Sequence, residues 1–69
     1  MAEPRLIVRL KEVRAEAGLT QQELADRAGV SRKTVNTIEN RVFTPSVLVA
    51  LVLAKALAVP LDDLFQLDD

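Results

Sequence analysis

The segment Leu19-Thr-Gln-Gln-Glu-Leu-Ala-Asp-Arg-Ala-Gly-Val-Ser-Arg-Lys-Thr-Val-Asn-Thr-Ile-Glu-Asn40 decides the fold of this chain. Within it, Thr20-Gln-Gln-Glu23 has the spacing of a capping box, in which the Thr20 hydroxyl accepts from the Glu23 amide and the Glu23 carboxylate accepts from the Thr20 amide. Gly29 suits the left-handed residue that ends a helix, and Ser31 is a favoured N-cap for the next one. The segment therefore predicts two helices joined by a very tight turn, over about residues 20–40.

The helix expected after Ser31 has two unlike faces. Val35 and Ile38 lie at a spacing that turns both side chains inward. The opposite face carries polar side chains at helical spacing, namely Arg32, Lys33, Asn36, Thr37 and Asn40. This outer face is rich in hydrogen-bond donors and almost free of acid.

Periodicity and turn residues predict three further helices. Before the central segment, apolar residues recur at helical spacing and end near Gly18; they are Leu6, Leu10, Val13 and Ala17. After it, a fourth helix is expected to begin around residues 44–46, with Pro45 in its first turn, and to run to about Leu57. Pro60 starts a fifth, in which Asp62 and Asp63 suit the positive end of the helix dipole.

The two ends of the chain also favour extended structure. Leu6-Ile-Val8 is rich in strand-favouring residues, and Phe65-Gln-Leu67 alternates apolar with polar. These segments are expected to pair as a short antiparallel ribbon, and residue 6 thus has competing helix and strand predictions. The predicted fold class is a compact all-α, five-helix domain with a short terminal β-ribbon, spanning residues 1–69 as a single domain.

Composition excludes several classes of function. The chain has no cysteine and no histidine, so disulfides and thiolate metal sites are excluded and a zinc site would rest on carboxylates alone. An enzyme needs a nucleophile with its base, or a carboxylate pair, inside a cleft, and 69 residues enclose little volume. We therefore expect no enzyme, no cofactor and no small-molecule substrate.

The apolar run from Val47 to Ala54 is far shorter than the roughly 20 residues that cross a bilayer. The N-terminus, with Glu3 and Pro4, lacks the layout of a signal peptide. We therefore expect no membrane partner and a cytoplasmic location.

Charge is unevenly distributed along the chain. The formal net charge is −1, which by itself is unusual for a nucleic-acid-binding domain. However, residues 1–45 hold eight Lys/Arg against six Asp/Glu, whereas residues 46–69 hold one lysine against four aspartates. The basic part of the chain can face DNA while the acidic part faces away.

The central segment closely resembles the helix-turn-helix of the phage repressor and Cro family, also called the XRE family. The flanks Leu10-Lys-Glu-Val-Arg14, Thr44-Pro-Ser46 and Val59-Pro-Leu-Asp-Asp-Leu-Phe65 also look like single-domain members of that family. The resemblance implies a five-helix fold whose second helix crosses the DNA backbone and whose third helix lies in the major groove. It implies a sequence-specific, double-stranded DNA-binding transcriptional regulator, with repression the expected role.

The resemblance also assigns candidate DNA contacts. Gln21 matches a position that contacts phosphate and sometimes braces the reading helix, and Arg41 stands where glycine is common in the family. By chemistry, Arg32 suits guanine, Asn36 suits adenine and the Thr37 methyl suits thymine. The full expected set comprises Gln21, Gln22, Ser31, Arg32, Lys33, Thr34, Asn36, Thr37, Asn40 and Arg41.

The fourth helix is apolar nearly all round. Leu48 and Val52, one turn apart, fall at positions that are often polar in the family; core packing and a partner surface both remain open for them. We expect a homodimer on a two-fold symmetric operator, with Leu48, Val52, Leu61, Leu64 and Phe65 at the interface. The alternative is a protein-binding module, such as an antitoxin or anti-regulator, that holds another protein on this helix.

Overall fold

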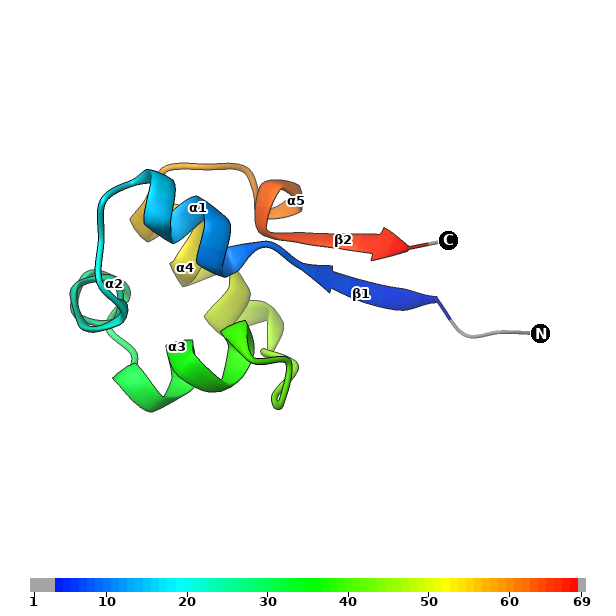
Figure 1. The fold of residues 1–69 in the computed structure, drawn as a ribbon, viewed down its shortest axis with the longest axis horizontal. Helices are drawn as coiled ribbons and strands as arrows, with labels where there is room; N and C mark the ends of the chain where they lie inside the picture. The colour runs from blue at the N-terminus through cyan, green and yellow to red at the C-terminus, as the bar shows by residue number, and fades with distance from the viewer. Residues whose placement is uncertain (1–3, 69) are drawn as a thin grey trace.

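The computed structural model describes residues 4–68 as a helical body with a projecting ribbon (Figure 1). The elements in chain order are β1 (Arg5–Val8), α1 (Leu10–Glu16), α2 (Gln21–Ala28), α3 (Arg32–Glu39), α4 (Val47–Leu57), α5 (Leu61–Leu64) and β2 (Phe65–Asp68). Because the ribbon extends from one side of the body, the molecule measures 40 × 20 × 19 Å. The expected fold class, five helices with a terminal ribbon, is confirmed.

Local capping defines the helix starts, as the sequence predicted. The Thr20 hydroxyl accepts from the Glu23 amide at 3.0 Å, and the Glu23 carboxylate accepts from the Thr20 amide at 2.9 Å. Ser31 caps α3 through the Thr34 amide at 3.0 Å. Gly29 ends α2 in the left-handed conformation, with φ 74°, so α2 and α3 meet across the tight turn that defines a helix-turn-helix.

Two expected boundaries are wrong. At Leu6 the strand prediction is confirmed and the helix prediction is wrong, because Leu6 pairs with Leu67 in the antiparallel ribbon and α1 begins only at Leu10. Pro45 does not lie in the first turn of α4, because the Ser46 hydroxyl accepts from the Val49 amide at 3.2 Å and makes Ser46 the N-cap. The proline therefore precedes the helix.

The core receives a large side chain from every helix. The fully buried large residues are Leu10, Leu24, Val35, Ile38, Leu53 and Leu64. Burying each such side chain contributes on the order of 1.5–3 kcal/mol before the entropy of ordering is counted. Leu64 corrects an expectation: it was placed at the dimer interface, but it is 0% exposed and has no surface to offer a partner. Four-residue α5 docks on the body through this side chain.

Candidate nucleic-acid interface

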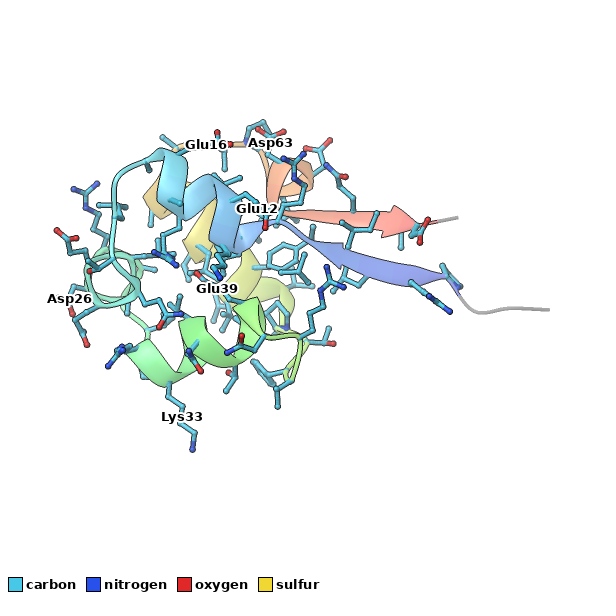
Figure 2. The ribbon with its side chains drawn as sticks, viewed as in Figure 1. Glu12, Glu16, Asp26, Lys33, Glu39 and Asp63 are labelled. Atoms are coloured by element: carbon cyan, nitrogen blue, oxygen red, sulfur yellow. The ribbon has the colours of Figure 1, made fainter. Side chains whose placement is uncertain are left out.

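The outer face of α3 is free of covering elements in the part of the chain that the structure describes. Arg32, Lys33 and Asn36 are exposed and line an open hollow of about 470 Å³. Lys33 points away from the body in Figure 2. Three of the side chains predicted to meet bases or phosphates thus share one surface, and they can approach a partner together.

Two hydroxyls on this face are engaged in the helix itself. The Thr37 hydroxyl donates back to α3, where the Lys33 carbonyl lies at 2.9 Å and the Thr34 carbonyl at 3.1 Å. Ser31 Oγ is occupied in capping α3 and lies 2.8 Å from Thr34 Oγ1. Consequently Thr37 has its methyl, rather than its hydroxyl proton, to offer outward.

A partly buried ion pair connects α3 to α1. Arg14 donates to Glu39 through Nε at 2.6 Å and Nη2 at 3.1 Å, and its Nη1 donates to the Leu19 carbonyl at 2.8 Å. The Arg14 side chain is 14% exposed and the Glu39 side chain 2%. The hydrogen bonds from the guanidinium to the Glu39 carboxylate raise the pKa of Arg14. The Arg14 guanidinium therefore stays charged, and its hydrogen bonds to Glu39 join the rear of the reading helix to α1.

From Glu39 a chain of amides runs to the reading face. Gln21 Nε2 donates to Glu39 Oε1 at 3.0 Å, and because a carboxylate only accepts, this orients the Gln21 amide. Gln21 Oε1 then faces Asn36 Nδ2 at 3.4 Å, and Asn36 Oδ1 accepts from Asn40 Nδ2 at 3.2 Å. Gln21 is thus positioned as a brace for Asn36, while its contact with phosphate stays a prediction.

Gln22 is exposed on α2, and its contact with DNA stays a prediction. Its side-chain amide donates to Asp26 within α2 at 2.9 Å. Arg41 follows the C-cap Asn40 and takes the left-handed conformation, with φ 60°, although it has a side chain. It occupies the conformation that glycine favours, and its exposed guanidinium lies at the end of the reading helix.

Sequence reasoning missed two exposed apolar residues beside α3. Val42 is 77% exposed and Phe43 is also exposed, and both line a second hollow that includes Lys33 and Thr37. The available signal was the occurrence of two consecutive apolar residues in a segment predicted to be a loop, where side chains face solvent.

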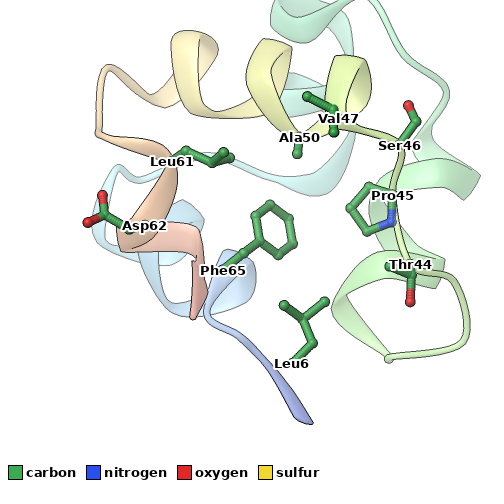
Figure 3. A pocket seen from close by; sticks show the side chains of 9 residues that line it. All are labelled: Leu6, Thr44, Pro45, Ser46, Val47, Ala50, Leu61, Asp62 and Phe65. Carbon is green, nitrogen blue, oxygen red and sulfur yellow. The ribbon is translucent and has the colours of Figure 1, made fainter. Parts of the chain in front are cut away.

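A separate apolar surface covers the outside of α4. Val47, Leu48 and Leu51 are exposed, Leu48 by 72%, whereas Val52 is half-buried. Beside it, a hollow of about 380 Å³ lies between the start of α4, α5 and β1 (Figure 3). Its lining is Leu6, Thr44, Pro45, Ser46, Val47, Ala50, Leu61, Asp62 and Phe65. Leu61 and Phe65, two of the expected interface residues, line this hollow together with Leu6 and Val47, and their place in a dimer interface stays a prediction.

The longest helix over residues 4–68, α4, has 11 residues. No helix there is long and apolar enough to cross a membrane. No group of three or more acidic side chains in that range could hold a metal ion.

Sequence comparison places the chain among regulators. The helix-turn-helix family model matches residues 10–64. The HTH-type transcriptional regulator YgzD of Bacillus subtilis is 39% identical over 61 residues, covering 88% of this chain and 92% of that protein. An HTH-type transcriptional regulator of Methanothermobacter thermautotrophicus is 43% identical over 61 residues, covering 87% and 88%.

Two solved structures share the fold. The restriction-modification controller protein C.AhdI from Aeromonas hydrophila has a TM-score of 0.78 at 34% identity, covering 80% of this chain and 83% of that one. The biofilm master regulator SinR, solved in complex with DNA, has a TM-score of 0.74 at 31% identity, covering 77% and 86%. These relatives are regulators and not enzymes. The chain therefore belongs to the helix-turn-helix family of DNA-binding transcriptional regulators, of the phage repressor and Cro (XRE) type.

Proposed function

We propose that this regulator is a sequence-specific repressor that binds operator DNA as a homodimer, with α3 of each protomer in a major groove. The observation that carries the proposal is the exposed α3 face, on which Arg32, Lys33 and Asn36 converge. Arginine pairs bidentately with guanine and asparagine with adenine, and both patterns are read in the major groove.

The amide chain supports sequence-specific reading rather than simple phosphate binding. Asn36 is held by Gln21 on one side and Asn40 on the other, and Gln21 is held by the buried Glu39. A base-reading side chain gains discrimination when its orientation is fixed before binding, because less conformational entropy is lost on contact. Nonspecific binding to phosphates needs no such arrangement.

The homodimer is supported by the apolar surface outside α4. Val47, Leu48 and Leu51 expose apolar area that a small domain gains by covering. The hollows beside α3 are lined by α3, its N-cap and the loop after it, and by no residue of α4. A dimer formed through α4 therefore leaves both reading faces free to enter successive major grooves.

The dimer arrangement supports repression, and the organisms of the relatives support a cytoplasmic location. A dimer that occupies two successive major grooves obstructs other proteins on that DNA, so repression needs no further contact. We place its action in the cytoplasm, because the relatives come from bacteria and archaea, whose DNA lies there.

Selection of bound duplexes from a random DNA pool tests this function. We expect enrichment of a two-fold symmetric sequence with half-site centres about 34 Å apart, one turn of DNA. Lys11→Ala is the control, since Lys11 is exposed on α1 and lines neither hollow beside α3. In an electrophoretic titration of the selected duplex, discrete shifts of the DNA band that weaken at higher salt concentration support a regulator. A protein that enriches no sequence would instead be the antitoxin or anti-regulator, acting through α4.

Transcription in vitro tests the sign of regulation. With the selected operator placed across a promoter, we expect the protein to lower transcript yield at concentrations that occupy the operator. An unchanged or increased yield at full occupancy would remove the repressor assignment while leaving DNA binding intact.

A further inference from the structure

An apolar ledge lies directly beside the reading face of α3. We define it as the Thr37 methyl, Val42 and Phe43. Val42 is 77% exposed, Phe43 is exposed, and with Lys33 they line an open hollow of about 380 Å³. Exposed apolar side chains next to a polar, basic surface call for an apolar group on the partner of that surface.

The ledge is fixed in place by backbone hydrogen bonds. The amides of Val42 and Phe43 both donate to the Thr37 carbonyl, at 2.9 and 3.3 Å. The amide of Arg41 donates to the Ile38 carbonyl at 3.1 Å, and its left-handed conformation turns the chain back along α3. The loop therefore presents the two side chains at a set position next to α3.

Thr37 completes the apolar character of the ledge. Its hydroxyl is directed at the Lys33 and Thr34 carbonyls of its own helix. A hydroxyl held in this way has its proton occupied, so the γ-methyl is the group that Thr37 adds to the surface. Lys33 borders the ledge and provides positive charge there.

We propose that the ledge recognises the C5-methyl groups of thymine in the operator, with Val42 the specificity-determining residue. The proposal rests on the proposed function, in which α3 enters the major groove. The thymine methyl is the one apolar group that the four standard bases present there. The basic surroundings of Val42, which include Lys33 and Arg41, suit DNA better than an apolar protein partner.

Removing the methyl group from the DNA tests the proposal. The probe is the duplex selected from the random pool, compared with duplexes in which each thymine is replaced singly by uracil. Uracil lacks only the C5-methyl, so base pairing and hydrogen-bond donors stay the same. At the contacted positions we expect affinity to fall by about fourfold per methyl, the loss that one buried methyl corresponds to.

Variants of the ledge residues are then measured with the same thymine and uracil duplexes. For Val42→Ala and Thr37→Ser, the ratio of the affinities for the thymine duplex and the uracil duplex should fall toward one. For Val42→Ile, this ratio should stay as in the wild type. Leu67→Ala is the control, because Leu67 is 65% exposed on β2 and the substitution removes apolar surface away from both α3 and the outside of α4. Since Val42 is mostly exposed, its variants should keep the wild-type circular dichroism and melting temperature.

Three results would overturn the proposal. One is a selected duplex in which no thymine responds to uracil. Another is a response that persists undiminished in Val42→Ala and Thr37→Ser, since the methyl is then read elsewhere. The third is a Val42→Ala variant that weakens both duplexes equally. Each of these leaves the proposed function standing, whereas absence of any selected sequence would remove both.

Discussion

Arg14 of α1 holds Glu39 of α3 in a two-pronged ion pair, with Nε 2.6 Å from Oε2 and Nη2 3.1 Å from Oε1. Only 2% of the Glu39 side chain is exposed. A carboxylate in this setting is tolerated because its partner and its hydrogen bonds offset the cost of removing it from water. The pair joins the first helix to the last turn of the reading helix.

Glu39→Ala should therefore lower the free energy of unfolding by about 3 kcal/mol, because it leaves the Arg14 guanidinium buried without its partner. Urea titration followed by circular dichroism measures the change. The matched control is Arg9–Glu12, a pair at 3.7 Å on the surface of α1. Glu12→Ala should cost less than about 1 kcal/mol, since exposed pairs are screened by water. Equal losses in the two variants would show that burial of Glu39 does not matter.

Arg32→Ala should change which sequences are bound, because we expect Arg32 to touch a base. Gln21→Ala should weaken binding more evenly across sequences, because its predicted direct contact is with phosphate. Each substitution should cost on the order of 1–3 kcal/mol where the contact exists. Random-pool selection with each variant measures both effects. A uniform loss for Arg32→Ala would make it a backbone contact, and altered specificity for Gln21→Ala would show that its brace on Asn36 dominates.

The sequence predicted those features that depend on neighbouring residues. The caps at Thr20 and Ser31 and the stop at Gly29 each act within four residues, and all three are confirmed. Pro45 was expected in the first turn but lies two residues before Val47, the first residue of α4, because proline suits both the first helical turn and the residue before an N-cap.

Features that depend on distant residues were missed. The Arg14–Glu39 pair joins residues 25 apart in the chain, and no local pattern marks its two members. The sequence predicts that Leu64 helps to dock the fifth helix on the core, which is confirmed, but a four-residue helix gives too short a pattern to exclude Leu64 from the dimer interface as well. On the reading face, the residue types were predictable, but the fixed orientation of Asn36 was not, since it depends on contacts across two helices.

Arg41→Gly should stabilise the fold while weakening DNA binding. A side chain in the left-handed conformation costs roughly 1–2 kcal/mol, and glycine removes this cost. Glycine also loses more conformational entropy on folding, which offsets part of the gain, so we expect a net stabilisation of about 0.5–1 kcal/mol. Loss of the charge should reduce the salt dependence of operator binding by about one phosphate contact. Ala58→Gly, at φ 56° after α4, is the control and should give the stability gain alone. An unchanged salt slope in Arg41→Gly would place Arg41 away from phosphate.

Glu23 should make the start of α2 sensitive to acid. Hydrogen bonds from the Thr20 amide and hydroxyl lower the pKa of Glu23 below the ordinary value of a glutamate carboxyl. A group with a lowered folded-state pKa adds stability above its unfolded pKa and loses it as pH falls through the folded value. Glu23→Gln should therefore melt at a lower temperature than the wild type at pH 7, and the difference in melting temperature should narrow as the pH falls below the ordinary glutamate value of about 4.3. A gap that stays constant down to pH 2 would contradict this charge effect.

Leu48→Glu should split the proposed dimer. Leu48 is 72% exposed on α4, so the variant can fold, whereas half-buried Val52 is a less clean site for the same change. Across a two-fold axis each substitution places two carboxylates close together and away from water, which opposes association. We expect sedimentation equilibrium to give a dimer for the wild type and a monomer for Leu48→Glu at roughly tens of micromolar. Operator affinity should fall by on the order of a hundredfold, because the two half-sites are no longer bound together.

Ala15→Glu, exposed on α1, should leave both measurements unchanged. A wild type that stays monomeric without DNA, or a Leu48→Glu variant that dimerises normally, would remove α4 as the interface.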